Sequence, residues 1–180
     1  MSKKIEENPE FLKKVAPIRF LVLDVDGVMT DGKIGYTSAG DECKSFDAKD
    51  GVGIKYWIRA GHRAGIITGR SSPAVARRAE ELGVGFVAQN AREKLPVFEK
   101  MLADAGVSAG ETAVMGDDLA DIPLIRRAGV GIAVADAVAE TKDAALWTTE
   151  KTGGNGAVRE VIEAILKAQD RWTVILSRYC

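Results

Sequence analysis

The sequence predicts an α/β fold with a doubly wound, mainly parallel sheet, and two observations lead to this prediction. Short apolar segments alternate with amphipathic segments along most of the chain, which is typical of successive strands and helices. The first apolar segment, Phe20 to Leu23, is uninterrupted and runs into a turn that contains glycine. A short run of this kind indicates a strand that is buried on both faces of a parallel sheet.

Composition and charge narrow the class of protein. The 180 residues are 46% hydrophobic and 28% charged, as expected for one globular domain with its own core. The net charge is −1 and the sequence has no basic tract, so the electrostatic field of the protein does not favour binding to nucleic acid or to a membrane. Two cysteines form no disulfide framework. The first 15 residues lack the apolar centre of a signal peptide, and no apolar run approaches the roughly 18 residues of a membrane span, so we expect a cytoplasmic protein.

The first third of the chain contains the only insertion that we expect. Residues 1–17 are charged and predict a lead-in segment, either a short amphipathic helix or a tail. A single domain is expected over 18–170, followed by a tail at 171–180. Residues 33–46 flank a Ser-Ala-Gly-Asp turn and predict a β-hairpin that is too short to be a domain. A helix is then expected from Asp50-Gly51 to Gly61, and its predicted apolar face consists of Val52, Ile54, Trp57 and Ile58.

The remaining elements follow the alternating pattern. Further strands are expected at 64–67, 84–88, 112–115, 130–134 and 146–148. Further helices are expected at 72–82, 92–105, 119–127, 138–142 and 158–168. Ser72 and Pro73 stand in the order of an N-cap and a first helical residue. In the helix at 92–105, the predicted apolar face consists of Leu95, Phe98 and Leu102.

Two aspartates follow the first predicted strand, at Asp24 and Asp26. Open α/β sheets place their chemistry at the carboxyl ends of strands. One carboxylate there can attack an electrophile while the second moves a proton as general acid and base. The alternative is a pair of solvated loop acids, and the pair alone does not decide between the two interpretations.

Two later sites offer groups that bind an anion. Thr68-Gly69-Arg70 follows a predicted strand and combines a hydroxyl, backbone amides and a guanidinium. Taken alone, it is better explained as a capped turn with an arginine in solvent. Lys94 lies near a helix start, where a cation opposes the helix dipole and requires compensation, for example by a bound anion. Taken alone, Lys94 is a surface lysine.

A cluster of acids follows the strand at 112–115, in the segment Gly116-Asp117-Asp118-Leu119-Ala120-Asp121. Three acids within five residues at a strand end indicate a site for a hard cation with oxygen ligands. Helix capping by Asp117 or Asp118 would account for one of them but not for the cluster. Together with the preceding sites, these groups supply what phosphoryl transfer requires, which is a nucleophile, an acid/base, phosphate contacts and a magnesium site.

These motifs resemble those of the haloacid dehalogenase superfamily of phosphatases. DVDGVMTDG resembles its first motif, TGR its second, Lys94 its third and GDDLAD its fourth. More closely, the chain resembles the 3-deoxy-D-manno-octulosonate 8-phosphate phosphatase group over residues 19–169. This closer resemblance rests on the hairpin, FDAKDGVGIK, IITGR, the spacing from Gln89 to Lys94, and GGNGAVREVIEAIL.

The resemblance implies a capless Rossmann-like domain that acts in lipopolysaccharide biosynthesis. It implies a homotetramer assembled through the hairpin, with each active site closed by a neighbouring subunit. Asp24 would be the nucleophile and form an aspartyl-phosphate, and Asp26 would be the general acid/base. Magnesium would be held by Asp24, the backbone carbonyl of Asp26 and Asp117, and the phosphoryl group by Thr68 and Lys94. The positions that would face the substrate are Asp26, Asp47, Lys49, Asp50, Gly51, Lys55, Gly69, Arg70, Arg78 and Lys94.

Several positions depart from the pattern of this group. Asp47-Ala48-Lys49 stands where Asn-Val-Arg is usual, Lys55 replaces an arginine, and Asn90 and Asn155 replace a glycine and a basic residue. Lysine does not reproduce the bidentate grip of arginine on a carboxylate. A nonulosonate 9-phosphate of the sialic-acid type is therefore an alternative substrate.

Two alternatives from other classes of protein remain. A phosphoacceptor signalling domain of the receiver type also combines aspartates, a threonine and a lysine, although its acceptor ends a middle strand. A non-catalytic module that only assembles beside a nucleotidyltransferase is disfavoured because all the motif residues are retained. Among the other residues, we expect His62 at the surface without a catalytic role, Trp57 and Trp147 in the core, and Trp172 at a contact between subunits.

Overall fold

The computed structural model describes residues 9–179 and contains one six-stranded sheet in which every pairing is parallel. The strand order is β5-β4-β1-β6-β7-β8. The bounds are β1 Phe20–Leu23, β4 Arg63–Ile67, β5 Phe86–Ala88, β6 Thr112–Gly116, β7 Val130–Ala133 and β8 Trp147–Thr148. The chain runs outward from β1 in one direction and then from β6 in the other. The switch point of this doubly wound sheet therefore lies between β1 and β6, where such folds bind ligands.

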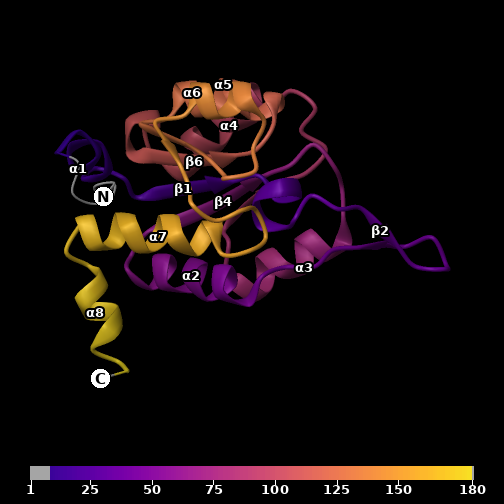
Figure 1. The fold of residues 1–180 in the computed structure, drawn as a ribbon, viewed down its shortest axis with the longest axis horizontal. Coiled ribbons are helices and arrows are strands. Elements are labelled where there is room, and N and C mark those ends of the chain that lie inside the picture. The colour runs from indigo at the N-terminus through magenta and orange to yellow at the C-terminus, as the bar shows by residue number, and fades with distance from the viewer. Residues whose placement is uncertain (1–8, 180) are drawn as a thin grey trace.

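Helices cover both faces of the sheet, and each face has its own core (Figure 1). The helices α2 Ala48–Arg59, α3 Pro73–Leu82 and α7 Ala157–Ala168 lie on one face. The helices α4 Lys94–Ala105, α5 Ile122–Arg127 and α6 Ala139–Ala144 lie on the other. Because side chains alternate along a strand, Leu21 and Leu23 of β1 belong to the core on the α7 side, whereas Phe20 and Val22 belong to the core on the α4 side. This explains the uninterrupted apolar run of β1.

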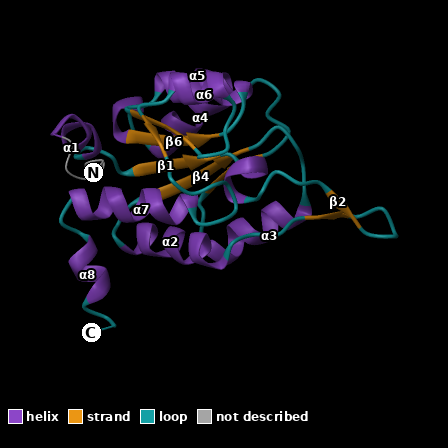
Figure 2. Cartoon of the chain, in the orientation of Figure 1, coloured by secondary structure: helices purple, strands orange, loops and turns teal. Residues whose placement is uncertain are grey.

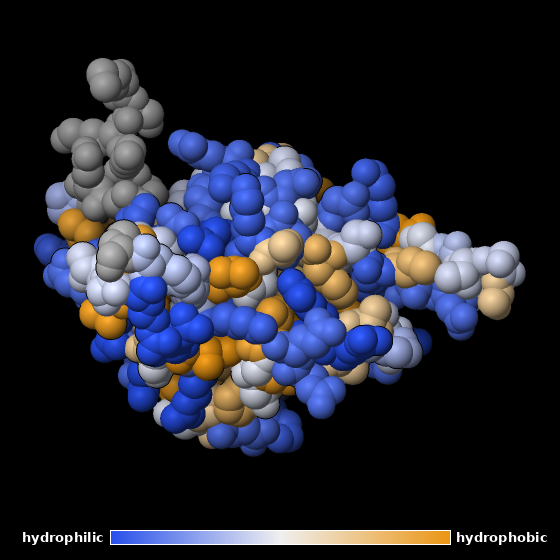
Figure 3. Space-filling model, turned by 90° about the horizontal axis from the view of Figure 1, so that it is seen from below, coloured by the Kyte–Doolittle hydropathy of each residue, from blue (hydrophilic) through white to orange (hydrophobic). Residues whose placement is uncertain are grey.

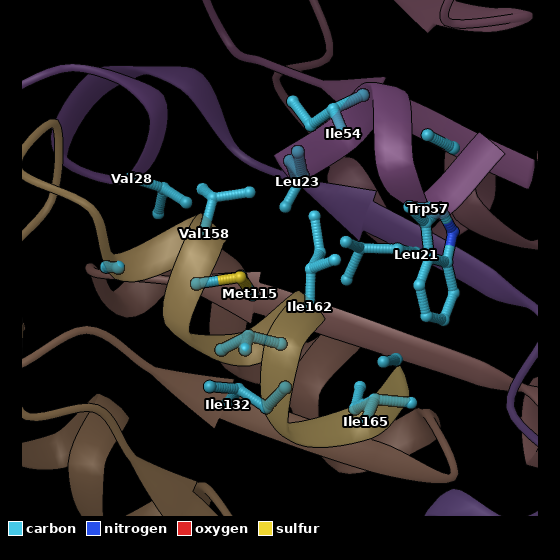
Figure 4. Packing of buried hydrophobic residues seen from close by; sticks show 14 of the residues in the cluster. Leu21, Leu23, Val28, Ile54, Trp57, Met115, Ile132, Val158, Ile162 and Ile165 are labelled. Carbon is cyan, nitrogen blue, oxygen red and sulfur yellow. The ribbon is translucent and has the colours of Figure 1, made fainter. Parts of the chain in front are cut away.

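The core under α7 holds the first strand in place. Figure 4 shows Leu21 and Leu23 of β1 packed with Ile162 of α7 and Trp57 of α2, all of them buried. Burial of a side chain of this size contributes about 1.5–3 kcal/mol to folding. The predicted core positions of Trp57 and Trp147 are confirmed, since they are 0% and 8% exposed.

The predicted hairpin is present and is the only insertion into the α/β pattern among residues 9–179. It consists of β2 Gly35–Tyr36 and β3 Glu42–Cys43, paired antiparallel. It extends away from the body of the protein (Figures 1 and 2). In the space-filling view it is the protrusion on the right, and residues 31–41 are all exposed (Figure 3). The α/β class, the parallel sheet and the absence of a cap domain are therefore as predicted.

Two helices lie near the ends of the chain. The helix α1 Pro9–Val15 contributes Phe11 and Val15 to the core, which agrees with the short lead-in helix expected there. The helix α8 Trp172–Leu176 was not predicted, and it buries Ile175. The division of the chain at residues 17 and 170 stays a prediction, although both end helices reach the main core. Within residues 9–179, no helix combines the length and the apolarity that a membrane span needs.

Two of the predicted apolar faces are wrong in part. The helix α2 starts at Ala48, because the Asp47 carboxylate caps it by accepting the Asp50 N–H at 2.9 Å. Val52 is 41% exposed, since α7 packs against the neighbouring side of α2. In α4, Leu95 is 37% exposed and Lys94 is buried in its place. Apolar periodicity failed here because a charged residue occupies the inward-facing position.

The predictions for two other segments also need correction. His62 is not a surface residue, because it is only 8% exposed and its ring lies 4.2 Å from that of Trp57. Its Nε2 shares a hydrogen bond of 2.9 Å with the Gln169 side chain, and burial lowers the pKa of the imidazole. The helix expected at 119–127 is divided into a 3₁₀ turn at Leu119–Asp121 and the helix α5.

Candidate active site

Three neighbouring strands end beside one another and carry the predicted chemical groups. Asp24 follows β1, Thr68 follows β4 and Asp117 follows β6, and β1 pairs with both of the other strands. Lys94 lies at the start of α4 on the same side of the sheet. The switch point between β1 and β6 therefore has an aspartate on each side.

Lys94 is buried between two carboxylates. Its Nζ donates to Asp24 Oδ1 at 2.8 Å and to Asp121 Oδ1 at 2.7 Å. Burial acts to lower the pKa of Lys94, but the two carboxylates outweigh it and the pKa is raised. The cation at the helix start is thus compensated by aspartates. The interpretation of Lys94 as a surface lysine is therefore excluded.

The Asp24 carboxyl has a raised pKa of about 6. The largest cause is burial, and repulsion from Asp121 adds to it, while Lys94 opposes both. The side chain is held in one orientation by its contact with Lys94. An oriented and weakly solvated carboxylate is suited to act as a nucleophile.

Asp117 is the acid of this group that forms no ion pair with any of the described residues. Its Oδ1 is buried without a hydrogen bond, and burial together with repulsion from Asp24, Asp121 and Asp118 raises its pKa to about 8. One carboxylate oxygen from each of Asp24, Asp117 and Asp121 lies within 4.8 Å of the others. A divalent cation would relieve this repulsion and satisfy the unpaired oxygen. These residues therefore fit Mg²⁺.

The sequence indicates Asp121 only as one of three acids of a cation site, and the structure gives it two specific contacts. Its Oδ1 accepts from Lys94, and its Oδ2 accepts the backbone N–H of Asp117 at 3.0 Å. It therefore joins the lysine to the loop that carries Asp117. The available signal was its place as the third acid of GDDLAD. The Asp118 carboxylate caps the 3₁₀ turn by accepting the Leu119 N–H at 2.7 Å, so capping does account for one acid of the cluster, as expected.

A tight turn after β1 presents Asp26. Gly27 has φ +93°, and a Cβ at this residue would lie 2.1 Å from Asp117 Oδ2, so only glycine lets the turn approach the acid cluster. The Thr30 N–H closes the turn on the Val25 carbonyl at 3.0 Å. The loop at 152–156 packs on it, because a Cβ at Gly153 would lie 1.7 Å from the Gly27 carbonyl oxygen. The GGNG loop thereby supports the first motif.

The hairpin supplies a cation to Asp26 that the sequence did not indicate. Lys44 follows β3, and its Nζ contacts Asp26 Oδ1. Arg70 Nε lies 3.8 Å from Asp26 Oδ2, and the same guanidinium contacts Glu42 of β3. Thr68, next to β4, is 2% exposed and accepts the Arg70 N–H at 3.4 Å. The structure therefore brings Asp26, Thr68 and Arg70 to the same side of the sheet.

The other predicted substrate contacts have different surroundings. The Asp50 carboxylate accepts the N–H groups of Gly156 and Arg159 at 3.2 and 2.8 Å, and it thereby caps α7. Arg78 donates to the Asp47 carbonyl at 3.3 Å and lies close to Gly51. Lys49, Lys55 and Gly69 are exposed. A substrate contact by any of these residues stays a prediction.

The raised pKa of Asp117 has a consequence for stability. The ordinary pKa of an aspartate is near 4, whereas the pKa of Asp117 in the folded state is about 8. At pH values between these two, the folded state binds more protons at Asp117 than the unfolded state does. This group therefore makes the free energy of unfolding fall as pH rises. In chelator, we expect the free energy of unfolding to decrease more from about pH 5 to about pH 8 for the wild type than for Asp117→Asn. His62, whose pKa is lowered, makes the free energy of unfolding rise with pH, and it is present in both proteins.

Magnesium should reverse this loss because it binds the ionised carboxylates. Denaturant unfolding with and without Mg²⁺ measures the effect. The midpoint of wild-type unfolding should rise more at about pH 8 than at about pH 5, and less in Asp117→Asn. If the free energy of unfolding changed equally with pH in the two proteins, the raised pKa of Asp117 would be contradicted.

Comparison with known proteins is consistent with this geometry. The family model of haloacid dehalogenase-like hydrolases matches residues 86–162. The 3-deoxy-D-manno-octulosonate 8-phosphate phosphatase of Yersinia pestis is 40% identical over 162 residues, which cover 90% of this chain and 87% of that protein. The corresponding enzyme of Haemophilus influenzae is 38% identical over 162 residues and 90% of each chain.

A solved structure shows the same likeness in three dimensions. The enzyme of that name from Moraxella catarrhalis, in complex with a magnesium ion, a phosphate ion and a KDO molecule, superposes with a TM-score of 0.93. It is 40% identical, and the match covers 95% of this chain and 98% of that one. The sequence motifs, the acid cluster at the switch point and these similarities agree, and the chain belongs to the haloacid dehalogenase-like hydrolases, in the group of the 3-deoxy-D-manno-octulosonate 8-phosphate phosphatases.

Proposed function

We propose that this protein is a magnesium-dependent phosphatase that hydrolyses 3-deoxy-D-manno-octulosonate 8-phosphate in lipopolysaccharide biosynthesis. The observation that carries the proposal is the buried group at the switch point, in which Lys94 holds Asp24 and Asp121 while Asp117 remains unpaired. This arrangement offers an oriented nucleophile beside a site for a divalent cation, as phosphoryl transfer requires. The name of the related enzymes supports the choice of substrate.

The proposed reaction divides into two steps. In the first, a carboxylate oxygen of Asp24 attacks phosphorus, and the ester oxygen leaves with the bonding electron pair and takes a proton from Asp26. In the second, Asp26 takes a proton from a water molecule, whose oxygen attacks the aspartyl-phosphate and releases phosphate. Thr68 and Lys94 would bind the phosphoryl oxygens.

Magnesium would be held by the carboxylates of Asp24 and Asp117 and by the backbone carbonyl of Asp26. When bound, it would neutralise charge on the phosphoryl oxygens. Asp121 is a weaker candidate ligand, because both of its oxygens already accept hydrogen bonds. We assign it to the positioning of Lys94 and of the Asp117 loop.

The direct test is a turnover assay with a panel of sugar phosphates. We expect phosphate release from 3-deoxy-D-manno-octulosonate 8-phosphate in Mg²⁺ and a loss of at least roughly 100-fold when a chelator removes the metal. The panel includes nonulosonate 9-phosphates, since Lys49 and Lys55 replace arginines of the group pattern. A higher kcat/KM for a nonulosonate would move the assignment to that substrate, and no release from any ester would refute the phosphatase.

The comparisons favour a hydrolase over the phosphoacceptor signalling domain and the non-catalytic assembly module, because the matched family and the named relatives are hydrolases.

We also propose that the protein forms a homotetramer. The exposed hairpin supports this, since it presents Ile34 and Tyr36, which are 40% and 64% exposed, away from the body of the chain. The mass of the particle in solution tests the assembly.

A further inference from the structure

The hairpin reaches the reaction site through one buried lysine. The Lys44 side chain is 2% exposed, although lysine is rarely buried without a partner. Its Nζ contacts Asp26 Oδ1 and forms an ion pair of 3.2 Å with Glu42 Oε1. The described contacts of this ammonium are therefore to the carboxylate assigned as the general acid/base and to a carboxylate of the hairpin itself.

A second cation completes the network without replacing Lys44. Arg70 contacts Glu42, but its Nε lies 3.8 Å from Asp26 Oδ2, which is beyond hydrogen-bond distance. The Arg70 side chain is also 45% exposed, so solvent weakens its hold on Asp26. Lys44 is thus the buried cation that fixes the orientation of the Asp26 carboxylate.

The contact with Lys44 gives the two carboxylate oxygens of Asp26 different surroundings. Oδ1 is occupied by Lys44, whereas Oδ2 is buried and has no hydrogen-bond partner among the described residues. A general acid/base must hold one oxygen free to carry the proton and must present it in a fixed direction. An aspartate on a turn has two freely rotating side-chain bonds, and a buried ammonium on one oxygen restricts both.

We propose that Lys44 is a positioning residue for the reaction, which orients the Asp26 carboxyl so that this carboxyl exchanges the proton with the leaving oxygen. The proposal rests on the proposed phosphatase function. It makes the junction between the hairpin and the domain part of the active site. It also assigns Lys44 a role that differs from those of the phosphoryl-binding and metal-binding residues.

A comparison of two substrates with different leaving groups distinguishes a positioning role of Lys44 from a structural one. An alkyl phosphate, such as a sugar phosphate, expels a basic alkoxide that needs a proton as the bond breaks. The p-nitrophenolate of p-nitrophenyl phosphate is a weak base and leaves without help. General acid catalysis typically contributes 10²–10⁴-fold, so a misplaced Asp26 should slow the first step far more for the sugar phosphate than for the aryl ester.

The test measures kcat and kcat/KM of Lys44→Met on both esters in saturating Mg²⁺. We expect a loss of roughly 30-fold or more in kcat/KM for the sugar phosphate and of less than about threefold in kcat/KM for p-nitrophenyl phosphate. The ratio kcat/KM reports the steps up to departure of the leaving group, whereas kcat also contains the hydrolysis of the aspartyl-phosphate, which both esters share. Lys33→Met is the matched control, because Lys33 precedes β2 in the same insertion and, among the described residues, forms an ion pair only with the exposed Asp31. It should leave both activities unchanged.

The outcomes are distinct. A parallel loss of kcat/KM on both esters, no loss of kcat/KM on either, or the same difference between the esters in Lys33→Met would overturn the positioning role. If Lys44→Met does not fold, Lys44→Gln, which keeps a donor but no charge, is measured for the same ratio. A wild-type protein that hydrolyses neither ester would instead refute the proposed function itself, so the two failures are distinguishable.

Discussion

Asp24→Asn is expected to abolish phosphate release, with kcat lower by a factor on the order of 10⁴ or more. The amide keeps the size and shape of the side chain and can still accept a hydrogen bond from Lys94. It removes the nucleophilic carboxylate, however, and with it the covalent route. Release of inorganic phosphate from the sugar phosphate in saturating Mg²⁺ measures the effect.

Stability distinguishes this loss from misfolding. Asp24 is buried next to Asp121, and its pKa is raised, so the ionised carboxylate costs folding free energy near neutral pH. Asp24→Asn should therefore unfold at the same or a higher denaturant concentration than the wild type in chelator. Asp104→Asn is a suitable control, since Asp104 pairs with Lys100 at the surface of α4. Turnover by Asp24→Asn, with the amide verified by mass spectrometry, would refute the assignment of the nucleophile.

Lys94→Met should reduce both activity and stability. The lysine is 7% exposed and bonds two carboxylates, and its removal leaves Asp24 and Asp121 buried without their cation. Breaking a buried ion pair from one side costs about 3–5 kcal/mol. Loss of the ammonium also removes a phosphoryl contact, so kcat/KM should fall by roughly 10²–10³-fold.

The dependence on pH makes this second prediction specific. With Lys94 gone, protonation is what relieves the buried carboxylates in chelator, so the loss of stability should be larger at about pH 8 than at about pH 5. Lys100→Met, on the exposed side of the same helix, removes a lysine whose one ion pair within residues 9–179 is with Asp104, and it should change neither property. A loss of stability that is independent of pH would show that Lys94 acts through packing alone.

Much of the fold follows from local pattern. The apolar run of β1, the Ser72-Pro73 helix start and the amphipathic helix at 157–168 all lie where the sequence predicts them. The errors have a common origin. Periodicity predicts that Val52 and Leu95 face inward, but the neighbouring helix and the buried Lys94 decide which side of each helix faces the interior. The sequence pattern does not predict burial of His62, because its partner Gln169 lies 107 positions away.

The sequence alone determined which chemical groups are present and that they gather at one edge of the sheet. Asp24, Thr68 and Asp117 each follow a strand, and a parallel sheet brings the carboxyl ends of its strands together whatever the details of packing. Only the tertiary structure decided which charges meet. Lys94 reaches Asp24 across 70 positions and Asp121 across 27, and Lys44 reaches Asp26 across 18. Such pairings depend on how the helices and the hairpin pack on the sheet. The energy of an ion pair depends on the distance between its charges in space, and no local sequence pattern encodes that distance.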